Sequence, residues 1–146
     1  MKKKNLPLNN TPSSLDTPGL RIRAARNEAN LSIRELAALS GLTPEAISML
    51  ENGVHPPSLK SLRKISACLN RPIHYLGCFE NLPESTFGER LKKARLFHGL
   101  TKKEASIEFG TDTRVITNWE SNRVLPPEKY LDIISVFIRI LATTNK

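Results

Sequence analysis

Residues 31–53 read LSIRELAALSGLTPEAISMLENG, and residues 100–122 read LTKKEASIEFGTDTRVITNWESN. The two stretches belong to a longer internal repeat, in which residues 19–69 align with residues 88–138 without a gap. Repetition at one fixed spacing indicates a structural unit that occurs more than once. A unit of about 55–65 residues can just bury a small hydrophobic core of its own. We therefore expect two small domains in this chain of 146 residues.

Signals for helix starts and ends lie at matching places in the two units. Ser32 and Glu35 form a capping-box pattern, in which each side chain binds the backbone N–H of the other residue. Gly41 then marks a helix end, and Pro44 suits the first turn of the next helix. Residues 101–110 repeat the capping box and the glycine. The pattern predicts pairs of short helices joined by a tight turn, over residues 33–40 and 44–52, and again over 102–109 and 113–121.

These paired helices and the residues around them resemble the lambda-repressor/Cro-like (XRE) family of helix-turn-helix proteins. In the first unit the matching positions are Arg26, residues 31–37, residues 41–43, Ile47, Ser48, residues 50–53 and Pro57. In the second unit they are Arg95, residues 99–101, Glu104, Gly110, Ile116, Thr117, Trp119, Glu120 and Pro126. The resemblance implies an all-α chain of two tandem lambda-repressor-like domains, each with four to five short helices.

The expected organisation has four parts, and the repeat places their boundaries. Residues 1–18 form a disordered arm, because they combine Lys2–Lys4 with prolines and small polar residues and lack an apolar face. The other parts are a first helix-turn-helix domain, a linker and a second helix-turn-helix domain that ends in a long apolar helix, over residues 19–78, 79–86 and 87–146.

The resemblance implies a role in reading double-stranded DNA in the major groove, where base edges are distinguishable. The residues expected to face bases are Pro44, Glu45, Ser48 and Met49, then Thr113, Arg114, Thr117 and Asn118. The residues expected at phosphates are Ser32, Arg34, Thr43 and Asn52, then Thr101, Lys102, Lys103 and Arg123. The pairs Arg26–Glu51 and Arg95–Glu120 are expected to be structural ion pairs that join the first helix of a unit to the end of its third.

The two base-facing sets differ in their chemistry. Arg114 and Asn118 suit guanine and adenine, whereas Pro44 and Met49 offer no hydrogen bond to a base and Glu45 repels phosphate. We therefore expect the second unit to carry most of the sequence readout. The function implied is a sequence-specific transcriptional regulator of repressor type, from a bacterium, a phage or a mobile element. An alternative is an antitoxin-like protein-interaction adaptor in which only the second domain binds DNA.

Composition favours these two readings over an enzyme. The net charge of +8 favours a polyanionic partner. Cys68 and Cys78 have no metal-ligand spacing, and no nucleophile–base pair or phosphate-binding glycine loop is recognisable. We expect no catalytic residues, no cofactor, no metal and no small-molecule ligand. A signal peptide, a membrane-spanning segment and a C-terminal sensor domain are not recognisable either, so a cytoplasmic location is expected.

The C-terminal helix has more apolar residues than one core face needs. Nine of the residues from Tyr130 to Leu141 are apolar or aromatic. Either the segment folds over the core as one extended helix or it forms a contact between subunits. A homodimer through this helix is therefore a hypothesis. Within the core we expect Trp119, and at residue 122 we expect an asparagine in the left-handed conformation that Gly53 adopts in the first unit.

Overall fold

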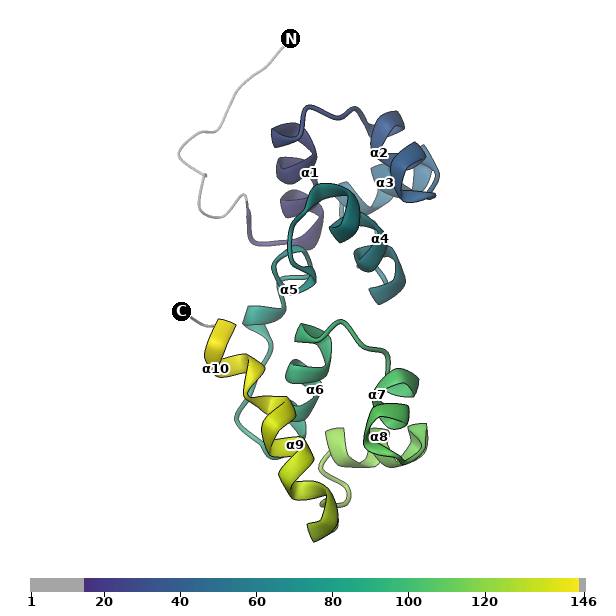
Figure 1. Cartoon of the computed structure of the whole chain (residues 1–146). Helices are drawn as coiled ribbons and strands as arrows, with labels where there is room; N and C mark the ends of the chain where they lie inside the picture. Colours follow the sequence, from purple (N-terminus) through teal and green to yellow (C-terminus); the bar gives the residue numbers. More distant parts are fainter. Residues whose placement is uncertain (1–14, 145–146) are drawn as a thin grey trace. The chain divides into compact units, whose positions relative to one another are not determined.

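The structure, a computed structural model, describes residues 15–144, and every regular element in this range is a helix. The contacts within the chain divide it into two compact units, with the boundary between Cys78 and Phe79 (Figure 1). The basic segment Lys2–Lys4, expected to belong to a flexible arm, lies outside the described residues.

The first unit is built from five helices within residues 15–78. They are α1 (Pro18–Glu28), α2 (Ile33–Ser40), α3 (Pro44–Glu51), α4 (Leu59–Leu69) and α5 (Ile73–Leu76). Apolar residues at helical spacing point inward from each of the longer helices, and the most deeply buried are Ile22, Leu36, Ile47, Leu62 and Ile65. The short α2 and α3 pack against each other, and α1 and α4 close the other sides of the core (Figure 1).

The second unit has a similar order of helices within residues 79–144. They are the 3₁₀ turn η3 (Phe79–Asn81), α6 (Phe87–Phe97), α7 (Lys102–Phe109), α8 (Thr113–Glu120), the 3₁₀ turn η4 (Glu128–Tyr130), α9 (Leu131–Ile138) and α10 (Ile140–Thr144). Trp119 lies in the centre of the core and is 2% exposed, so its expected place in the core is confirmed. Phe109, Tyr130 and Phe137 surround it or extend the same aromatic cluster.

The caps and turns predicted from the sequence are present. In both predicted capping boxes the hydroxyl accepts from the glutamate backbone N–H and the glutamate accepts from the hydroxyl residue's N–H, at 2.7–3.1 Å. Gly41 and Gly110 have φ of 80° and 73°, as a left-handed helix end requires. Asn122 also has a positive φ, 63°, which confirms the expected replacement of glycine. Local chemistry therefore defines the start and end of the paired helices.

A close approach between two helices explains why glycine occurs at both 19 and 88. A Cβ added at Gly19 would lie 2.3 Å from the carbonyl oxygen of Leu50, and one at Gly88 would lie 2.3 Å from that of Glu120. The first helix of each unit therefore crosses the end of the third with no room for a side chain. In the second unit the contact is reinforced because the Gly88 N–H donates to the Asn122 side chain over 2.8 Å.

The end of the expected arm is structured. Helix α1 begins at Pro18, and the hydroxyl oxygen of Thr17 caps it by accepting from the backbone N–H of Leu20 at 3.2 Å. The carbonyl oxygen of Leu15 accepts from Arg21 Nε at 2.7 Å. Within the segment expected as an arm, residues 15–18 are therefore held against the first unit by a cap and a buried arginine.

The segment expected as a linker is attached to the second unit. Phe79 packs against the core of that unit. Lys93 is 3% exposed, and its ammonium group donates to the carbonyl oxygen of Glu80 at 3.1 Å and to the carboxylate of Glu84 at 2.7 Å. A buried lysine needs such partners. Residues 79–84 are therefore held along α6 by one side chain that the sequence does not distinguish from a surface lysine.

The long C-terminal helix expected from the apolar run is divided into three parts. The turn η4 precedes α9, and a second break lies at Arg139, whose N–H donates to the carbonyl oxygen of Val136 at 3.2 Å. This i→i−3 bond is of the 3₁₀ type. Helix α10 continues beyond this break and packs against α6, where Leu141 is 4% exposed. The expected helix is therefore interrupted where the following segment packs onto the core.

The turn η4 stands where the first unit has the first turn of α4, and only part of the inward face is shared between α4 and α9. Ile65 and its repeat counterpart Ile134 are both buried. Leu62 is 1% exposed in the first unit, whereas its repeat counterpart Leu131 is 44% exposed. Phe137 is buried instead, stacked on His98 with a ring separation of 4.1 Å.

The glycine contact gives a stability prediction. We expect Gly88→Ala to lower the free energy of unfolding of the second unit by about 3 kcal/mol, since backbone atoms must separate to admit the methyl group. Urea unfolding followed by the fluorescence of Trp119, the single tryptophan, measures this. Gly110→Ala is the control, because its Cβ meets nothing within 4 Å and costs about 1 kcal/mol of left-handed strain. A smaller loss for Gly88→Ala than for Gly110→Ala would contradict the close-approach argument.

Candidate nucleic-acid interface

In the first unit, α3 turns one face to the core and the other outward. Ile47, Leu50 and Glu51 are buried. Thr43 caps the helix by accepting from the Ala46 N–H at 3.0 Å. Of the residues expected to face bases, Glu45 and Met49 are exposed. Pro44 and Ser48 are half-buried. The outer face of α3 thus offers one carboxylate, one hydroxyl and apolar groups.

In the second unit, α8 has the same orientation relative to its core but a different outer face. Asp112 caps the helix by accepting from the Val115 N–H at 3.1 Å. Thr113, Arg114 and Thr117 are exposed, and Asn118 is half-buried. The outer face of α8 thus offers a guanidinium, hydroxyls and an amide, which are the groups that hydrogen-bond base edges.

An arginine–glutamate pair joins the first helix to the end of the third in both units. Arg26 donates to the two carboxylate oxygens of Glu51 at 2.6 and 2.8 Å, and also to the carbonyl oxygen of Leu31 at 2.9 Å. Arg95 and Glu120 form the same bidentate pair at 2.6 and 3.1 Å. The hydrogen bonds that Arg26 donates to Glu51 raise the pKa of Arg26 above its already high value, against the opposing effect of desolvation. These pairs position α3 and α8 without reaching their outer faces.

The ion pair gives a second stability prediction. Glu120→Ala leaves the guanidinium of Arg95 buried without its partner, so we expect a loss of about 3–5 kcal/mol in the free energy of unfolding. The double variant Arg95→Met with Glu120→Leu removes both charges and is expected to lose less. Both losses are measured by chemical denaturation with Trp119 fluorescence. If the double variant is the less stable of the two, the cost comes from lost packing and the argument from an unpaired charge fails.

The residues expected at phosphates fall into two groups. Ser32, Thr43 and Thr101 are helix caps, and each hydroxyl oxygen already accepts a backbone N–H. The side chains of Arg34, Lys103 and Arg123 are exposed, and Lys102 is half-buried. The Asn52 side chain is exposed, but its oxygen accepts from Arg23 at 2.7 Å. The second unit therefore has more cations available to an anion beside its paired helices.

A further cation was not identified from the sequence. Lys92 of α6 is exposed and lies beside Lys102, Thr117 and Ser121 around a depression of about 190 Å³. Its repeat counterpart Arg23 is engaged by Glu51 at 3.3 Å and by Asn52. Within residues 15–144, Lys92 makes no comparable ion pair. The repeat alignment pairs Arg23 with Lys92, but only the structure shows that one charge is neutralised and the other is open.

Other kinds of site find no support in the described residues. Among residues 15–144, no group of three or more His, Cys, Asp or Glu side chains could hold a metal ion. In the same range no helix is long and apolar enough to cross a membrane. Of the two cysteines, Cys68 is half-buried and Cys78 is buried.

Comparison with known proteins identifies the class of the first unit. Residues 22–76, which include most of α1 and all of α2 to α5, match the helix-turn-helix family HTH_3. The chain is also 43% identical over 53 residues to the uncharacterized HTH-type transcriptional regulator y4dL of Sinorhizobium fredii. That similarity spans 36% of this chain and 27% of the relative. No solved structure matches significantly. The first unit therefore carries a helix-turn-helix domain, and the family match ends before the second unit.

Proposed function

We propose that this protein is a sequence-specific, double-stranded DNA-binding transcriptional regulator with one helix-turn-helix reading head in each unit. The family match of residues 22–76 and the similarity to an HTH-type regulator support DNA binding by the first unit. The observation that carries the proposal for the whole chain is the duplicated scaffold. Each unit has a capped helix that ends in a left-handed glycine, and a buried Arg–Glu pair that holds the following helix, α3 or α8, with its outer face exposed.

The second unit is proposed to be the main reader of sequence. Arg114 is exposed on α8 and can donate two hydrogen bonds to guanine, and the Asn118 amide can pair with adenine. Lys92, Lys102 and Lys103 stand near the start of α7 and the end of α8, where they can neutralise phosphates. Backbone N–H groups at the helix starts favour the same anions. A repressor acting in the cytoplasm of a bacterial host, encoded by the cell, a phage or a mobile element, is what the family resemblance implies.

The second candidate is a protein-interaction adaptor in which the first unit contacts a protein and only the second unit contacts DNA. The apolar surface of the first unit favours it, because Leu39 is 62% exposed, Val54 is 64% exposed and Met49 is 40% exposed. Met49 lies on α3, the helix expected to face bases, Leu39 lies on the adjacent α2, and Val54 follows α3. Such exposed apolar residues fit a protein partner better than a polyanion. An antitoxin-like protein belongs to this class.

Selection of duplexes from a random DNA pool separates the two candidates. We expect the full chain to enrich a DNA motif of two parts. In Arg114→Ala, the preference for the correct base over the wrong base in one part should fall about 5- to 150-fold, which is the value of one good bidentate contact. Met49→Ala, a matched change on the outer face of α3, should retain the base preference that Arg114→Ala loses. Enrichment of a single short motif would favour the adaptor. Loss of sequence preference in Met49→Ala with none in Arg114→Ala would reject the assignment of the main reader.

The exposed ammonium group of Lys92 gives a test that does not depend on the DNA sequence. Lys92→Ala is expected to weaken binding to all duplexes about equally and to reduce the slope of log affinity against log salt by about 1, because one phosphate contact is lost. Fluorescence anisotropy at several salt concentrations measures both quantities. Glu108→Ala, an exposed change on α7, serves as the control. An unchanged salt slope in Lys92→Ala would show that this residue contacts no phosphate.

A further inference from the structure

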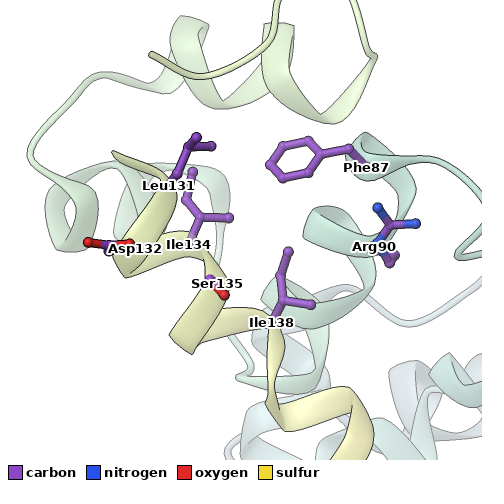
Figure 2. A pocket seen from close by; sticks show the side chains of 7 residues that line it. All are labelled: Phe87, Arg90, Leu131, Asp132, Ile134, Ser135 and Ile138. Atoms are coloured by element: carbon purple, nitrogen blue, oxygen red, sulfur yellow. The ribbon is translucent and has the colours of Figure 1, made fainter. Parts of the chain in front are cut away.

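A groove of about 450 Å³ runs between α6 and α9 of the second unit. Figure 2 shows Phe87 and Arg90 on the α6 side, across from the residues that α9 contributes. Apolar side chains form most of the lining, together with one guanidinium and one hydroxyl, and these residues are Phe87, Leu131, Ile134 and Ile138, then Arg90 and Ser135. A hollow of this volume with apolar walls and a few polar groups is typical of a small-molecule site.

The first unit shows which chemical groups cover the same position when it is filled. Arg21, the repeat counterpart of Arg90, is 9% exposed and lies 4.6 Å from the centre of the Tyr75 ring. The same tyrosine supplies an oxygen, because Arg21 Nη1 donates to its carbonyl oxygen at 2.7 Å. The first unit therefore covers its guanidinium with an aromatic ring and satisfies it with an oxygen acceptor from the same residue.

In the second unit the guanidinium lacks this cover. At the repeat spacing of 69 residues, the counterpart of Tyr75 is Thr144, which has no ring. Arg90 is half-buried, and its Nη1 donates at 3.4 Å to the carbonyl oxygens of Glu84 and Ser85, at the long end of hydrogen-bond distances. Within residues 15–144 no carboxylate pairs with Arg90. Its Nε and Nη2 atoms, which form the fork that binds a carboxylate side-on, are therefore open to an acceptor.

A serine beside the arginine differs between the units in the same way. In the first unit the Ser66 hydroxyl donates to the carbonyl oxygen of Arg71. Its repeat counterpart Ser135 is exposed on α9 and makes no such bond to the described residues. Ser135 and Arg90 line the groove together, and both also line a neighbouring hollow of about 280 Å³. Two polar groups that serve internal contacts in the first unit thus meet at one cavity in the second.

We propose that this groove binds a small aromatic carboxylic acid. Its carboxylate accepts from the free side of the Arg90 guanidinium and from the Ser135 hydroxyl. Its ring lies against Phe87 and Leu131, and so supplies the aromatic group that Tyr75 supplies in the first unit. The sequence alone does not indicate this site, because Arg90 and Ser135 match Arg21 and Ser66 in type and register.

The lining favours this ligand over three others. A neutral apolar molecule would leave Arg90 without an acceptor, and a DNA phosphate would leave the apolar walls exposed to water. A ligand with two negative charges is disfavoured because Asp132, which also lines the groove, is an exposed carboxylate on the flank of α9 away from α6 (Figure 2). The site lies on α6 and α9 and is tested without DNA, so the proposal does not depend on the proposed DNA-binding function.

Calorimetric titration of the full chain with phenylacetate tests the proposal. We expect one site per chain with a dissociation constant of about 1 mM or lower, as a molecule of this size allows. Phenylacetamide, which has the same shape without the charge, should bind at least about tenfold more weakly, and so should acetate, which has no ring. Arg90→Met should weaken phenylacetate binding at least about tenfold, and Ser135→Ala about two- to tenfold.

Two further measurements separate binding from folding. In the wild-type chain, phenylacetate should shift the amide NMR signals of Phe87, Ser135 and Ile138, which needs no variant. Lys64→Met removes an exposed cation from α4 of the first unit and should leave binding unchanged. The proposal is overturned if phenylacetate does not bind at about 10 mM, a limit that corresponds to a very weak site. It is also overturned if the shifts lie elsewhere, or if phenylacetamide or folded Arg90→Met gives equal affinity.

Discussion

The contact between the first helix and the end of the third is the constraint on which the rest of each unit depends. Seven residues separate Gly19 from Arg26 and Gly88 from Arg95, two turns on one helix face. The glycine admits the backbone of the third helix at one point, and the arginine binds its last glutamate at the other. Two attachment points fix both the position and the rotation of that helix. Its outer face can therefore vary in chemistry without loss of the scaffold.

Much of this scaffold could be predicted from the sequence because its determinants are local. A capping box needs residues three apart, and a left-handed turn needs glycine or asparagine at one position. Both could be read from residues 31–53 and 100–122 without knowledge of the core. The in-register repeat added the longer-range pairing, since Arg26, Glu51 and their counterparts recur together. The DNA contacts assigned to individual side chains stay predictions, because they depend on a partner as well as on the fold.

The features that escaped prediction depend on packing between distant segments. Leucine stands at both 62 and 131, which predicts equal burial, but a 3₁₀ turn precedes Leu131 and this leucine is exposed. Lys93 could not be distinguished from its exposed neighbour Lys92, because its burial depends on where residues 79–84 lie. Arg23 and Lys92 are alike in charge and register. They differ in availability because Arg23 binds both Glu51 and Asn52, whereas Lys92 lies near the equivalent Glu120 but has Ser121 in place of the asparagine.

The differences between the two units form a consistent pattern. In the first unit Arg23 is held by Glu51 and Asn52, and Arg21 is covered by Tyr75, so two cations serve internal contacts. In the second unit Lys92 is exposed, whereas Arg90 is half-buried and donates to the carbonyl oxygens of Glu84 and Ser85 at 3.4 Å. The same position on the first helix therefore serves an internal contact in the first unit and stays exposed beside α8 in the second. Two linked DNA-binding domains bind with a higher effective concentration than one, so the proposed second domain adds affinity as well as sequence readout.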